Sequence, residues 1–165
     1  MKQMKYDDAS WHSDGEFPED SPAEYGGTHI ALFMKWCFLK GWASDEHLLD
    51  AEDDLKDVIS NKMTATEFFF KYCDGKLTHE DFNEEGNDFA EAYYTESEFY
   101  LADYAEEFYE QMYIASEQEH DFTKFSKMVE NRYEDYSKLG SFSGDALGDM
   151  ARTKSDQTPW WKFWN

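Results

Sequence analysis

The stretch Thr28–Leu39, THIALFMKWCFL, decides the class of fold. Apolar side chains recur in it at intervals of three and four residues, the spacing that gathers them on one face of a helix. That face consists of Ile30, Phe33, Met34, Cys37 and Phe38. Thr28 can cap the start of such a helix, and Gly41 can end it. The pattern therefore predicts a helix over about 28–40 with one apolar face.

Similar patterns predict helices along most of the remaining chain. One is expected from Ser44 to Asn61, because Ser44 can cap it and acidic residues follow in its first turn. Its buried stripe would be Leu48, Leu55, Val58 and Ile59. Further helices are expected over 64–73, over 87–117 with a break near 95–97, and over 121–139.

No stretch shows the strict alternation of apolar and polar residues that indicates a strand with any strength. The sequence therefore predicts an all-α fold, an irregular single-domain helical bundle. Its expected parts are an ordered loop arm over 1–27, the helical bundle over 28–139, and a loop and aromatic tail over 140–165.

The charge of the chain limits its partners. The 165 residues include 37 acidic and 15 basic side chains, a net charge of -22 at pH 7. Such a chain lacks the clustered Lys and Arg that bind a phosphate backbone or an anionic membrane. Fifteen acidic residues and no Lys or Arg lie between Leu77 and Thr123. A basic protein is the expected partner, with no direct binding of nucleic acid or membrane.

The sequence carries no motif for catalysis or metal binding. Cys37 and Cys73 sit in apolar runs, so buried free thiols are expected rather than a disulfide or an activated nucleophile. The five histidines show no ligand spacing with one another or with the cysteines. The segment Asp74–Asp81 resembles the second half of an EF-hand loop, but the first ligand positions would fall on Phe70 and Tyr72. We therefore expect no metal, no cofactor and no enzymatic activity.

Two segments are candidates for contact with a partner. The acidic, tyrosine-rich stretch over 91–113 combines charge for steering with tyrosine rings for interface area. Its candidate contact residues are Glu91, Tyr94, Glu96, Glu98, Tyr100, Asp103, Glu106, Glu107, Tyr109, Glu110 and Tyr113. The second segment, Pro159–Asn165, holds four aromatic residues. It would fold back over the bundle, or else anchor a partner or a second copy of the chain.

Several segments resemble a family of small uncharacterised bacterial proteins. They are KYDDASWH over 5–12, FPED over 17–20, GTHI over 27–30, CDGKL over 73–77 and NEEGN over 83–87. The resemblance extends to about Tyr104 and implies a cytosolic bacterial protein without a known enzymatic activity. On this resemblance we interpret the Trp11–His12 and Thr28–His29 segments as structural signatures of the family fold, with a binding role as the alternative.

In type, the chain is similar to the small acidic immunity proteins that accompany bacterial toxins. The leading hypothesis is an immunity-type protein that neutralises a cytosol-acting toxin by covering its positive cleft. The alternative is a DNA mimic, of the anti-restriction or anti-CRISPR type, that blocks a nucleic-acid-binding machine. Absence of an apolar leader in Met1–Asp8 and of a membrane-spanning run favours a cytoplasmic location for either.

Overall fold

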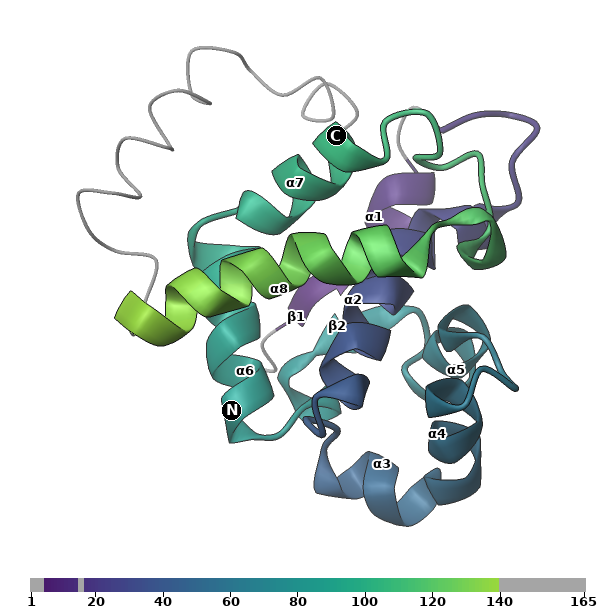
Figure 1. The fold of residues 1–165 in the computed structure, drawn as a ribbon. Helices are drawn as coiled ribbons and strands as arrows, with labels where there is room; N and C mark the ends of the chain where they lie inside the picture. Colours follow the sequence, from purple (N-terminus) through teal and green to yellow (C-terminus); the bar gives the residue numbers. More distant parts are fainter. Residues whose placement is uncertain (1–4, 15–16, 140–165) are drawn as a thin grey trace.

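The structure is a computed structural model that describes residues 5–14 and 17–139. It is mostly helical, with one small sheet (Figure 1). The α-helices of the described residues are α1 (Ala9–Ser13), α2 (Thr28–Leu39), α3 (Asp45–Asp50), α4 (Glu52–Ile59), α5 (Ala65–Tyr72), α6 (Glu84–Ala90), α7 (Phe99–Glu107) and α8 (Phe122–Leu139). The strands are β1 (Lys5–Asp8) and β2 (Lys76–Thr78). Shorter helical turns are η1 (Ala23–Gly27), η2 (His79–Asp81), the π-helix η3 (Glu91–Glu96) and η4 (Glu117–Glu119).

Helix α2 forms the centre of the core. Every side chain from Thr28 to Phe38 is buried, so the helix is covered on all sides rather than on one face. It packs against α4, α5, α8 and η1, and α8 crosses it in Figure 1. Burying each large apolar side chain in such a core contributes about 1.5–3 kcal/mol. None of the described helices combines the length and apolar character that crossing a membrane requires.

The loop arm expected over 1–27 contains regular secondary structure. Strand β1 pairs antiparallel with β2, with Asp7 opposite Leu77, and α1 and η1 follow it. Gly26 is required where η1 meets α1, because a Cβ there would lie 2.9 Å from the Ala9 carbonyl oxygen. The arm is thus a packed part of the fold, and its strand partner lies about seventy residues further along the chain.

The expected single helix over 44–61 is two helices. Ser44 caps α3 by accepting the backbone N–H of His47, but Ala51, at φ -133°, separates α3 from α4. The change of direction turns Leu48 and Ile59 outward, at 47% and 41% exposure. The prediction that these two residues are buried is therefore wrong, whereas Leu55 and Val58 are buried as expected.

The expected helix over 87–117 is also divided. Helix α6 runs into the π-helix η3, and Glu98, at φ +58°, separates η3 from α7. Helix α7 ends at Glu107, and turns connect it to η4. The final helix, α8, begins at Phe122 and matches its prediction closely. The predicted aromatic tail lies outside the described residues.

Candidate functional site

The charged part of the predicted contact region lies at the surface along α7. Five of its carboxylates are exposed, from the end of η3 to the turn after α7, and Glu91 is half-buried. We call the exposed set the acidic surface: Glu96, Glu98, Glu106, Glu107 and Glu110. Tyr109 and Ile114, in the turns after α7, are 62% and 57% exposed. The surface therefore combines negative charge with two apolar side chains.

The fold buries four of the predicted contact residues. Tyr94, Tyr100, Tyr113 and Asp103 are each at most 7% exposed. Their polar atoms bond inside the protein, as buried hydroxyl and carboxylate groups must. These residues hold the core together and are not available to a partner.

A hollow of about 220 Å³ lies between α7 and α8, at the edge of the acidic surface. Glu106, Glu107 and Asp135 line it, and Arg132 lies at its base beside Asp103. Nε and Nη2 of Arg132 donate to the two Asp103 carboxylate oxygens at 2.8 and 3.0 Å, while its buried Nη1 has no hydrogen-bond partner among the described residues. With three further carboxyl side chains on its walls, the hollow suits a cationic side chain.

A second group of polar residues is buried around Asp7 on β1. Its carboxylate accepts hydrogen bonds from the His12 Nε2 on α1 at 2.8 Å and the His29 Nε2 on α2 at 3.2 Å. The hydroxyl of Tyr94, on the π-helix η3, donates to the same carboxylate. The backbone N–H of Asp8 donates at 2.8 Å. We call these four side chains, Asp7, His12, His29 and Tyr94, the Asp7 cluster.

Hydrogen bonds in the Asp7 cluster favour the ionised form of Asp7, and burial favours the neutral ring of His29. Burial opposes ionisation of Asp7, but the positive charge of His12 and the bonds from His12 and His29 together hold its pKa well below its ordinary value. Burial, assisted by His12, lowers the pKa of His29 to about 4, so its ring is neutral at pH 7. Four donors form hydrogen bonds with the Asp7 carboxylate. The cluster therefore connects β1, α1, α2 and η3.

A third group brings together His47, Cys73 and Asp81, from α3, the end of α5 and η2. The Asp81 Oδ1 lies 2.8 Å from the His47 Nε2 and 3.3 Å from the Cys73 Sγ, and the Sγ and Nε2 lie 3.9 Å apart. Burial and the nearby Asp81 raise the pKa of the Cys73 thiol, which therefore stays protonated. Such a thiol is a poor nucleophile, because the thiolate is the reactive form.

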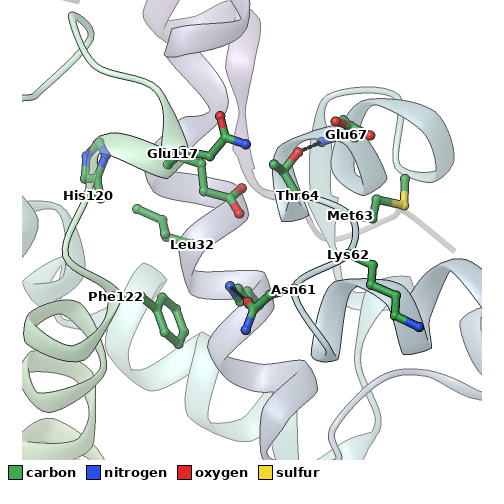
Figure 2. A pocket seen from close by; sticks show the side chains of 11 residues that line it. Leu32, Asn61, Lys62, Met63, Thr64, Glu67, Glu117, His120 and Phe122 are labelled. Carbon is green, nitrogen blue, oxygen red and sulfur yellow. Dashed lines mark hydrogen bonds between the residues drawn. The ribbon is translucent and has the colours of Figure 1, made fainter.

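A hollow of about 310 Å³ lies between α2, the segment after α4 and η4. Figure 2 shows Glu117, Asn61 and Phe122 among the side chains around it. The Glu117 carboxylate lies at the N-terminus of α5, where it accepts hydrogen bonds from two backbone N–H groups. Lys35 donates to the Asn61 Oδ1 at 2.7 Å. These bonds give both charged groups a structural role.

Sequence reasoning missed the two buried groups because each is assembled from distant segments. Asp7 and Tyr94 are 87 residues apart, and His47 and Cys73 are 26 residues apart. Spacing along the chain therefore shows no ligand pattern. The only available signal is the presence of Asp7, His12 and His29 within the segments 5–12 and 27–30, which also carry the resemblance given above.

A family model described as a domain of unknown function, DUF7832, matches residues 5–120. The chain belongs to the DUF7832 family. Comparison with curated proteins and with solved structures found no match. The DUF7832 region includes the acidic surface and both buried groups, and it ends just before α8. Arg132, on α8, therefore reaches back into the DUF7832 region when it binds Asp103.

Proposed function

We propose that the protein is an immunity-type inhibitor that binds a basic, cytosol-acting bacterial toxin through the acidic surface. The observation that carries the proposal is the set of exposed carboxylates at the two ends of α7, together with the exposed Tyr109 and Ile114. A toxin that cleaves nucleic acid needs a positive cleft to hold phosphates. Carboxylates along α7 would compete for that cleft.

The net charge supports this proposal because it lowers the stability of the fold but favours binding to a basic partner. A charge of -22 destabilises a compact fold by self-repulsion, while it accelerates association with a cationic partner. Complementary charge raises association rates, and buried aromatic or aliphatic anchors provide much of the affinity. Tyr109 and Ile114 are suited to that second role, since both are large and exposed next to the charged groups.

The hollow between α7 and α8 suggests the chemistry of one contact. A Lys or Arg side chain of the partner would enter between Glu106, Glu107 and Asp135. Nη1 of Arg132, which has no hydrogen-bond partner within residues 5–14 and 17–139, would meet a backbone carbonyl oxygen beside that cationic side chain. This arrangement would satisfy a buried donor only when the partner is bound.

The test is partner capture with three versions of the purified, tagged protein. One is wild type, and one carries Glu106→Lys, Glu107→Lys and Glu110→Lys. The control carries Asp50→Lys, Asp53→Lys and Glu85→Lys, three exposed carboxylates on α3, α4 and α6. The two variants have the same net charge, so nonspecific attraction changes equally in both. Captured proteins are washed in steps of rising salt and identified by mass spectrometry.

The proposal expects a single basic protein that survives high salt on wild type and on the control, and is lost from the α7 variant. That protein should be toxic when produced alone and harmless when the wild-type chain is produced with it. Equal retention by wild type and the α7 variant would contradict the role of the acidic surface. Several DNA-binding proteins that DNA displaces together would instead indicate the DNA mimic.

A further inference from the structure

We propose that His47, Cys73 and Asp81 bind a zinc ion. This site would be separate from the acidic surface, and its existence does not depend on the proposed function. Its three donors come from three elements of the fold, so the ion would join α3 and η2 to the end of α5.

The distances between the donor atoms are close to those around tetrahedral zinc. Bond lengths of about 2.0 Å to nitrogen and oxygen and about 2.3 Å to sulfur place tetrahedral ligands about 3.3 Å (N···O), about 3.5 Å (S···O) and about 3.6 Å (S···N) apart. The corresponding distances here are 2.8, 3.3 and 3.9 Å. Shifts of about half an ångström or less would therefore form three corners of a zinc tetrahedron.

The chemical types of the donors also favour zinc. A thiolate, an imidazole and a carboxylate together suit a borderline-soft cation, and all three occur among zinc ligands. Calcium and magnesium would reject such a set, because they require mostly oxygen ligands. The three protein donors leave the fourth position to a water molecule.

The surrounding bonds hold the carboxylate in place for this role. The second oxygen of Asp81 accepts the backbone N–H of Thr78 at 2.8 Å, within the capping box of η2. Bonds of this kind orient a ligand and raise its affinity for a metal. Cys73 is half-buried while His47 and Asp81 are buried, so the thiol marks the side from which an ion would enter.

Binding would exchange hydrogen bonds for coordinate bonds. The Cys73 thiol, which now donates to Asp81, would lose its proton to solvent as the S–Zn bond forms. The His47 Nε2 proton, which now donates to Asp81, would leave Nε2 so that this atom binds the ion, and the ring would carry its proton on Nδ1. Binding releases at least the thiol proton of Cys73, so the affinity should rise with pH.

The test is a titration of the chelator-treated, tag-free protein with Co²⁺ and then Zn²⁺. A thiolate bound to Co²⁺ absorbs in the near ultraviolet, whereas Co²⁺ on imidazole or carboxylate alone does not give this band. We expect one Co²⁺ per chain with that band, and its loss when Zn²⁺ displaces Co²⁺. Zinc should also raise the melting temperature of wild type.

The matched control is Cys37→Ala, which removes the buried thiol on α2 and leaves the proposed ligands in place. This variant should keep the band, and Cys73→Ala should lose it. We expect Cys73→Ala to weaken zinc binding by more than about 100-fold, because loss of a group that only orients a ligand already costs about 10–100-fold. Asp81→Asn should keep the thiolate band with weaker binding, which gives a second test if Cys73→Ala folds poorly.

A wild-type protein that shows no near-ultraviolet band at saturating Co²⁺ would overturn the proposal. So would a band that Cys73→Ala retains, or a rise in melting temperature that zinc gives equally to Cys73→Ala and wild type. None of these results would bear on partner capture by the acidic surface, so failure of the zinc site and failure of the proposed function are distinguishable.

Discussion

Arg132 on α8 donates two hydrogen bonds to the Asp103 carboxylate on α7, and both side chains are buried. The Tyr93 hydroxyl donates to the same carboxylate at 2.7 Å. This pair joins the family region to the helix that follows it. Planar guanidinium geometry is well suited to such two-point binding of a carboxylate.

Arg132→Met should destabilise the fold by about 3–5 kcal/mol, because it leaves the Asp103 charge buried without its partner. Lys56→Met breaks the exposed Lys56–Glu52 pair and should change stability little. Urea denaturation of the two variants gives the comparison. Adding Asp103→Asn to Arg132→Met should recover part of the lost stability. Equal losses of stability in Arg132→Met and Lys56→Met would contradict the role of the buried pair.

Asp7→Asn should cost about 3 kcal/mol of unfolding free energy, since it removes a buried charge from His12, His29 and Tyr94 and places an amide donor among donors. Tyr94→Phe removes one bond of the cluster and should cost about 1.5–3 kcal/mol. Denaturation curves check both values. Tyr72→Phe, which removes a hydroxyl bonded to Asp54 near the surface, serves as the control and should have a smaller effect than Tyr94→Phe.

Stability should fall as the pH is lowered from 6.5 to about 4. Burial lowers the pKa of His29 from 6.5 to about 4, so in this range the unfolded chain binds more protons than the folded protein. The contribution of His29 is complete above pH 6.5, where it amounts to about 3 kcal/mol. Burial also lowers the pKa of His120, which acts in the same direction. Below pH 4, protonation of Asp7, whose folded pKa is lowered, removes further stability.

Urea denaturation at several pH values between 4 and 7 measures this dependence. His29→Gln should flatten the slope partly, because His120 still contributes. The slope of wild type, measured in parallel, is the reference. An unchanged slope in His29→Gln would show that His29 is not held neutral by burial.

Glu117→Ala should cost about 1–2 kcal/mol, the range expected for loss of a helix cap. Its carboxylate accepts the Ala65 and Thr66 N–H groups at 3.0 and 2.7 Å, which are first-turn donors of α5. Glu117→Gln should cost less, because the amide oxygen can still accept one of these bonds. Gln118→Ala, at an exposed neighbouring position, should leave the denaturation midpoint unchanged.

Helical periodicity correctly predicted those helices whose apolar residues recur at helical spacing and lie in the core. Helix α2 and helix α8 agree with the pattern, because their apolar residues recur at helical spacing and pack directly onto the core. The sheet could not be predicted in the same way. Lys5–Asp8 is short and polar, and its pairing with Lys76–Thr78 depends on a distant segment.

The tyrosines show why the candidate site was predicted only in part. A buried Tyr needs an acceptor for its hydroxyl. For Tyr94 that acceptor is Asp7, and for Tyr100 it is the His29 backbone carbonyl. Neither acceptor is near in sequence, so the tyrosines could be taken for interface residues, while the neighbouring glutamates were correctly expected at the surface.

The Asp7 cluster also has a consequence for how fast the chain folds. Mostly helical proteins usually fold quickly, because their contacts are local. Here β1 must meet η3 across a separation of 87 residues, and His12 must meet Tyr113 across 101. Closing such long loops costs entropy before the contacts form. The completed core therefore depends on long-range closure, and folding should be slower than the helix content alone suggests.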